Sequence, residues 1–84
     1  MIKTYEFLVK VKGDPDEVQE KIDFPISEWS YWQNEIITFI ITWNSPELDW
    51  AISDIYQELD SKELNVIELT YLRTLSNEDY DYSY

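Results

Sequence analysis

A single segment, residues 44–63, constrains the fold of this chain most strongly. It reads NSPELDWAISDIYQELDSKE, and its proline suits the first position of a helix, where a backbone N–H would have no partner. We expect Pro46 at that position and Ser45 as the capping residue before it. At about 100° per residue the apolar side chains form one stripe, which comprises Leu48, Ala51, Ile52, Ile55 and Leu59. A helix with one apolar stripe has to pack that stripe against a second layer.

The polar side of the same helix is acidic and carries a tryptophan. Glu47, Asp54 and Glu58 form a stripe on one flank, and Trp50 is predicted to point away from the apolar stripe. Exposed tryptophans often act as anchors in protein interfaces. We therefore expect Glu47, Trp50, Asp54 and Glu58 to contact a partner protein, with Trp29 and Trp32 as further candidate anchors.

Two segments before residue 26 have clear periodicities. The alternation in residues 2–12 predicts a strand whose odd-numbered side chains, from Tyr5 to Val11, face the core. Gly13, the only glycine, ends this strand. Residues 14–22 are predicted to form a short helix, with Asp14 as its cap and Glu17 completing a capping box.

Three further strands are predicted. In residues 26–33, Trp29 and Tyr31 are expected on one face and Trp32 on the other, followed by a tight turn at residues 33–34. Residues 35–43 are β-branched and aromatic almost throughout, which strongly favours a strand. Residues 64–75 are predicted as the last strand, with four side chains on its core face: Ile67, Leu69, Tyr71 and Leu75.

The resulting order is strand, helix, strand, strand, helix, strand. It predicts an α+β fold of the ferredoxin-like βαββαβ type, a four-stranded antiparallel sheet with two helices on one face. We expect one domain over residues 1–75, followed by an acidic, tyrosine-rich tail over residues 76–84 that is flexible. Many unrelated functions share this fold, so function has to be argued from the surface.

The predicted fold leaves one face of the sheet uncovered. Four aliphatic side chains are expected there, namely Leu8, Ile36, Ile40 and Leu72. An exposed apolar patch of this kind often marks a homodimer or a second partner interface. The alternative is that scattered aliphatic side chains on a threonine-rich sheet are ordinary surface.

Several kinds of chemistry lack their usual residues. The chain has no cysteine and no histidine, which excludes disulfides, the usual zinc sites and hydrolase sites with a histidine base. One glycine cannot build a glycine-rich phosphate loop. Carboxylates cluster at residues 14–17 and 78–81, but a helix cap and a solvated tail explain them better than a calcium loop. We expect no enzymatic activity, no cofactor and no metal.

The charge of the chain limits its partners. Its 84 residues carry a net charge of −12, with 18 acidic residues against six basic ones. Such a charge repels phosphate backbones and anionic membranes, so we expect neither direct nucleic-acid binding nor membrane binding. A basic protein would gain in association rate. The N-terminus lacks an apolar signal region and no apolar run is long enough for a bilayer, which predicts a cytoplasmic protein.

In size and charge the chain resembles compact acidic inhibitors encoded by bacteriophages, such as anti-restriction and anti-CRISPR proteins. The resemblance implies a DNA mimic in the host cytoplasm that blocks the basic, nucleic-acid-binding surface of a host defence or DNA-processing protein. Asp79 and Asp81 in the tail would add to the acids of the helix. Along the helix those acids are spaced about 4 Å apart, sparser than the duplex, so mimicry would need the whole domain.

Two alternatives remain open from the sequence. Immunity proteins that neutralise nuclease toxins are also small and acidic, and they too bind a basic partner. A small dimeric structural module would use the open sheet face and would have no basic target. Charge reversal on the long helix separates the dimeric module from the DNA mimic and the immunity protein, because only the last two depend on the acidic surface.

Overall fold

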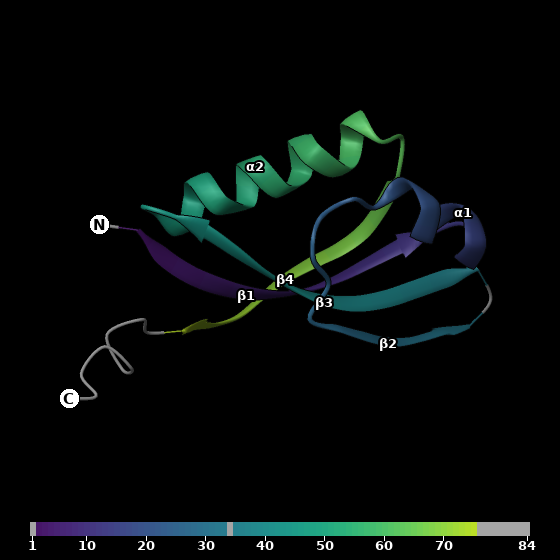
Figure 1. Cartoon of the computed structure of the whole chain (residues 1–84), viewed down its shortest axis with the longest axis horizontal. Helices are drawn as coiled ribbons and strands as arrows, with labels where there is room; N and C mark the ends of the chain where they lie inside the picture. Colours follow the sequence, from purple (N-terminus) through teal and green to yellow (C-terminus); the bar gives the residue numbers. More distant parts are fainter. Residues whose placement is uncertain (1, 34, 76–84) are drawn as a thin grey trace.

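The computed structural model describes residues 2–33 and 35–75, without the side chains of residues 30–33. It shows an α+β fold in which two helices lie on one side of a four-stranded antiparallel sheet (Figure 1). The predicted flexible tail at residues 76–84, with Asp79 and Asp81, lies outside the described residues, as does Asn34 of the predicted turn. The predicted fold class is confirmed.

The elements follow the predicted order along the chain. They are β1 (Lys3–Lys12), α1 (Pro15–Lys21), β2 (Glu28–Gln33), β3 (Ile36–Ser45), α2 (Leu48–Ser61) and β4 (Asn65–Leu75). In the sheet the strands lie in the order β2-β3-β1-β4, and all neighbours are antiparallel. This order is the ferredoxin-like one, with β1 and β3 in the centre and β2 and β4 at the edges.

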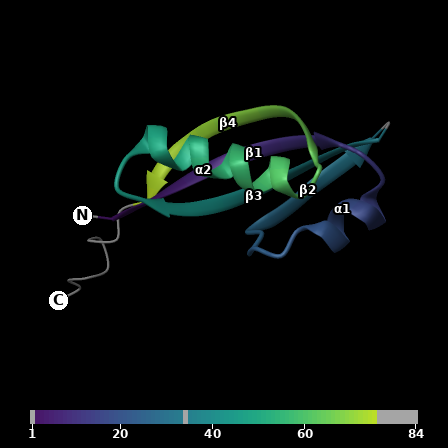
Figure 2. The same cartoon turned by 90° about the horizontal axis from the view of Figure 1, so that it is seen from above.

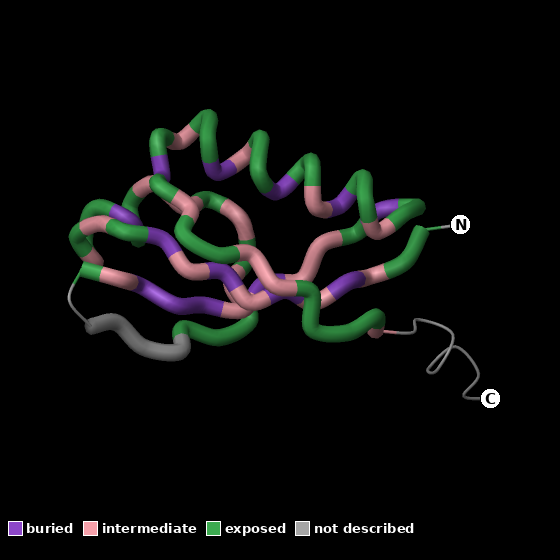
Figure 3. Tube along the Cα trace, turned by 180° about the vertical axis from the view of Figure 1, so that it is seen from behind, coloured by how far each residue is buried: buried purple, intermediate pink, exposed green. Residues whose placement is uncertain are grey.

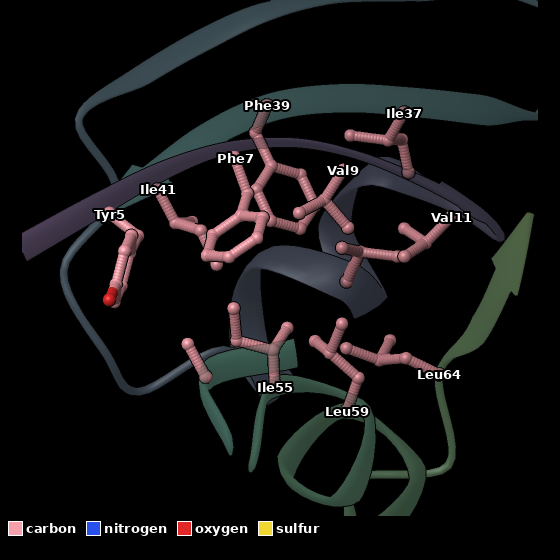
Figure 4. Packing of buried hydrophobic residues seen from close by; sticks show 12 residues of the cluster. Tyr5, Phe7, Val9, Val11, Ile37, Phe39, Ile41, Ile55, Leu59 and Leu64 are labelled. Atoms are coloured by element: carbon pink, nitrogen blue, oxygen red, sulfur yellow. The ribbon is translucent and has the colours of Figure 1, made fainter. Parts of the chain in front are cut away.

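The core lies between the sheet and the helices (Figure 4). The odd-numbered side chains of β1, from Tyr5 to Val11, are all buried, as the alternation predicts. They meet Val18 of α1 and three side chains of α2 in one apolar cluster. The predicted apolar stripe of α2 is confirmed, because Ala51, Ile55 and Leu59 are fully buried and Leu48 and Ile52 pack at its margin.

The short helix α1 begins as predicted. The Asp14 carboxylate accepts hydrogen bonds from the backbone N–H groups of Asp16 at 3.2 Å and Glu17 at 3.3 Å. These bonds satisfy two donors that have no partner inside the helix. The N–H of Gly13 donates to the carbonyl of Glu35 at 2.8 Å, which fixes the entry to α1 against the turn between β2 and β3.

The predicted start of the long helix is wrong. Ser45 is the last residue of β3 and pairs with Lys3 of β1, so its backbone is extended. Its buried hydroxyl donates to the carbonyl of Glu47 at 3.0 Å instead of capping the helix. Glu47 is the N-cap residue and makes no side-chain cap bond. Strand pairing with β1 continues to Ser45, and the helix therefore starts after Pro46, not with it.

The end of α2 forms a Schellman turn. The N–H of Leu64 donates to the carbonyl of Leu59 at 3.0 Å, and the N–H of Glu63 donates to the carbonyl of Asp60 at 2.9 Å. Glu63 has a φ of 61°, a conformation that normally favours glycine. Leu64 and Leu59 are both buried, which is the apolar contact expected of this turn.

Two irregularities in β4 change the predicted side-chain pattern. The pairing with β1 skips Ile67 and Leu72, so each acts as an extra residue in the edge strand. Leu69 still lies opposite Val9 on the core side, as predicted. Ile67, predicted to face the core, is instead 48% exposed, while Val66 takes the place opposite Val11. Leu75 lies opposite Thr4, on the open face rather than the core face. A strict two-residue period assigned both residues wrongly because it had no place for an extra residue.

An irregularity also interrupts β2. Trp29 lies opposite Phe39, and their ring centroids are 5.2 Å apart. The pairing then skips Ser30, so that the backbone of Trp32 lies opposite Ile37. The two-residue alternation predicted for this strand is therefore interrupted at Ser30.

Candidate protein-binding surface

The outward face of α2 carries the predicted tryptophan. Trp50 is 57% exposed and lies one turn before Asp54, which is also exposed. Glu47, just before the helix, is exposed too. In Figure 3 the buried positions of α2 recur on the side that meets the sheet, and the exposed positions face away from it. The predicted partner-binding residues of α2 thus lie on its outer side, except for Glu58.

Glu58 belongs to an ion-pair network. The Lys62 Nζ lies 3.1 Å from a carboxylate oxygen of Glu58 and 2.9 Å from one of Asp23, which follows α1. The Lys62 side chain is only 15% exposed. Hydrogen bonding to Lys62 lowers the pKa of Asp23, and hydrogen bonding to both carboxylates raises the pKa of Lys62. The sequence does not predict the role of Asp23, because the contact joins the segments that follow α1 and α2, which are far apart in the chain.

The acids of α2 are spaced more widely than phosphates. Four acidic residues, Asp49, Asp54, Glu58 and Asp60, lie in the helix itself, while Glu47 precedes it and Glu63 follows it. From Asp49 to Asp60 the helix rises about 16 Å, or about 4 Å per charge. A DNA duplex carries one charge per about 1.7 Å of axis. The helix alone is therefore too sparse to reproduce a duplex.

Charge is divided unequally between the two sides of the molecule. The helices and their connections, residues 13–27 and 46–64, hold eleven acidic residues and two lysines, a net charge of −9. The four strands hold three acidic and four basic residues, a net charge of +1. Ten of those eleven acids are exposed. Because both helices lie on the same side of the sheet (Figure 1), the helical layer is strongly acidic, while the strands are nearly neutral in sum.

The open sheet face pairs its charges internally. Arg73 lies 2.8 Å from Glu6, and Lys10 lies 3.6 Å from Glu68. The pKa of Glu68 is lowered, first by a hydrogen bond from Thr70 and then by the charge of Lys10. These contacts leave the face without a large excess of either charge.

The four aliphatic residues predicted on this face do not all come together. Leu8 and Ile40 are direct neighbours across β1 and β3. Ile36 lies at the far end of β3, opposite Lys12 and separated from Ile40 by Thr38. Leu72 is an extra residue of β4. Leu8, Ile36 and Ile40 are all half-buried, so the apolar surface of this face is small.

Two tyrosines are exposed at the surface although the sequence does not predict it. Tyr56 of α2 is 45% exposed and Tyr71 of β4 is 41% exposed. Tyr71 was predicted to face the core, and its ring does contact Tyr5 and Phe7 in edge-on geometry, with centroids 6.3 and 6.1 Å apart. It stays exposed because β4 is an edge strand with no neighbour beyond it.

Comparisons of the chain with protein-family models, curated proteins and solved structures find no match. Among the residues that the structure describes, no group of three or more potential metal-ligating side chains is placed to hold an ion. None of the described helices has the length and apolar character needed to cross a membrane. The features that bear on function are therefore the distribution of charge and the exposed aromatic rings.

Proposed function

We propose that this protein is a small acidic inhibitor that binds a basic, nucleic-acid-binding surface of another protein. The target is a host defence or DNA-processing protein, as for anti-restriction and anti-CRISPR proteins, and the acidic side takes the place of phosphates. The observation that supports this proposal is the division of charge, −9 on the helices and their connections against +1 on the strands. An acidic residue excess that served solubility alone would have no reason to be confined to one side.

The two helices contribute differently to this proposal. Because α2 is too sparsely charged to mimic a duplex, the exposed acids of α1, Asp16, Glu17 and Glu20, belong to the same surface. Long-range attraction to a basic target speeds association and weakens with salt. Trp50 supplies the apolar anchor, and burying it in the interface favours a long-lived complex.

The experiment is a capture of partners from a bacterial lysate with the tagged protein at low and high salt, with Trp50→Ala in parallel. We expect the unmodified chain to capture one basic nucleic-acid-binding protein, which added duplex DNA releases. Trp50→Ala is expected to hold the same protein more weakly. Capture of a single nuclease far more tightly than its relatives would identify an immunity protein instead. Recovery of no specific protein, from a chain that sediments as a dimer, would contradict the proposal and direct attention to the open sheet face.

A further inference from the structure

The two flanks of α2 differ in what they face. The flank that carries Glu58 and Lys62 is directed at Asp23, next to α1. Tyr56 lies two residues before Glu58, about 160° away around the helix, and so belongs to the opposite flank. Figure 2 shows β4 and α1 on opposite sides of α2, so the flank opposite Glu58 is the one turned toward β4.

The β4 side of α2 presents two tyrosine rings and two carboxylates. Tyr56 and Tyr71 are both substantially exposed, and the Tyr71 hydroxyl is within 2.6 Å of the Thr74 hydroxyl. Asp49 and Asp60 project from the same flank as Tyr56, about 20° and 40° from it around the helix axis. We call this surface the tyrosine flank and define it by Asp49, Tyr56, Asp60 and Tyr71.

The carboxylates of the tyrosine flank have no counter-charge in the described part of the chain. Asp49 and Asp60 are exposed and belong to none of its ion pairs. The basic residue nearest in sequence, Lys62, is held on the other flank by Asp23 and Glu58. A second copy of this chain would bring another net charge of −12 to the surface, which opposes self-association there.

We propose that Tyr56 and Asp60, which lie one helical turn apart on the tyrosine flank, bind an arginine side chain of the basic partner. The planar guanidinium stacks on aromatic rings and pairs with carboxylates in a fixed geometry, and this flank offers both groups. Lysine carries the same charge but a compact ammonium that stacks less well. The inference rests on the proposed function, since it names the side chain by which a basic partner is recognised.

The test uses two model peptides, hexa-arginine and hexa-lysine, both acetylated and amidated so that their charges match. Their dissociation constants for the full chain are measured by NMR titration at low salt. Hexa-arginine is expected to bind about two- to five-fold more tightly, the size of one exposed cation–π contact. Tyr56→Leu is expected to bring the ratio close to one, and Tyr56→Phe, which keeps the ring, to preserve it.

The outcomes separate this inference from the proposed function. Equal binding of the two peptides by the unmodified chain would overturn the arginine site while leaving an acidic binding side in place. If Trp50→Leu abolishes the preference for hexa-arginine and Tyr56→Leu does not, the arginine binds at the outward face of α2, and the site at Tyr56 is overturned. If the unmodified chain is a dimer and Tyr56→Leu is a monomer, a second copy of the chain occupies the tyrosine flank. That result would also overturn the arginine site. Binding of neither peptide would contradict the proposed function itself.

Discussion

The ammonium of Lys62 lies 2.9 Å from the carboxylate of Asp23, and this contact joins the end of α2 to the segment after α1. Lys62 follows the last residue of α2 and also bonds to Glu58, one turn earlier in that helix, so one lysine pairs with a carboxylate of each crossover connection. The ion pair thus links the two acidic helix-bearing segments of the chain. It reduces the repulsion between helices that both carry excess negative charge.

Replacing Lys62 by Met is expected to destabilise the fold, and the loss should depend on pH. The pKa of Asp23 is lowered in the folded state, so its contribution is fully present above the unfolded pKa and disappears as pH falls below about 4. The pKa of Lys62 is raised, so its contribution is present below the unfolded pKa and is lost above about pH 10.4. Urea denaturation at pH 6 and pH 3 should show a smaller effect of Lys62→Met at pH 3. A loss equal at both pH values would contradict the assigned ion pair.

Replacing Glu63 by Gly is expected to stabilise the protein by about 1 kcal/mol. Glu63 holds a φ of 61° in the Schellman turn, where glycine has no steric cost. It also places a negative charge at the negative end of the helix dipole. Glu63→Ala removes the charge but keeps the steric cost, so the difference between the two variants isolates the backbone term. Thermal and urea unfolding measure both, and a Gly variant no more stable than the Ala variant would contradict the left-handed assignment.

The cap of α1 gives a prediction about a single carboxylate. Asp14→Ala is expected to cost about 0.5–2 kcal/mol of folding free energy, because two backbone N–H groups lose their acceptor. Asp14→Asn keeps an acceptor oxygen and should retain most of the stability. Equal losses in the two variants, measured by urea denaturation, would mean that the charge of Asp14 matters and its capping bonds do not.

The irregular pairing of β4 predicts that the folding free energy depends more on Val66 than on Ile67, the reverse of what a regular strand would give. Ile67 is exposed, so Ile67→Thr should change the folding free energy by less than about 0.5 kcal/mol. Val66 lies opposite Val11 and packs against the core, so Val66→Ala should be the more destabilising change. A strictly alternating strand would reverse the order of the two variants, and urea denaturation of both decides between the registers.

The regular parts of the fold follow from local patterns in the sequence. The alternation of β1, the apolar stripe of α2 and the Asp14 cap each involve residues within one element, and all three were predicted. Ser45 was misassigned because its pairing with Lys3, more than 40 positions away, outweighs its preference as a helix cap. The extra residues of β4 have no sequence signal such as glycine.

The candidate surface was only partly predictable. Trp50 and Asp54 could be placed outward from helical spacing alone. The pairing of Glu58 through Lys62 with Asp23 depends on how α1 and α2 are arranged, which no local pattern contains. Tyr56 lies at the boundary between the apolar and polar sides of the helix, where helical projection assigns no clear environment, and it is exposed.

The acidic helix side is the central claim, and a matched pair of charge reversals tests it most directly. Asp54→Lys lies on α2 and makes no ion pair in the described part of the chain, whereas Glu28→Lys makes the same change in charge on strand β2. The measurement is the association rate of each variant with the captured partner across a range of salt concentrations. Asp54→Lys is expected to slow association and flatten its salt dependence, while Glu28→Lys leaves both nearly unchanged. Equal effects of the two reversals would contradict the claim, because net charge alone would then account for binding.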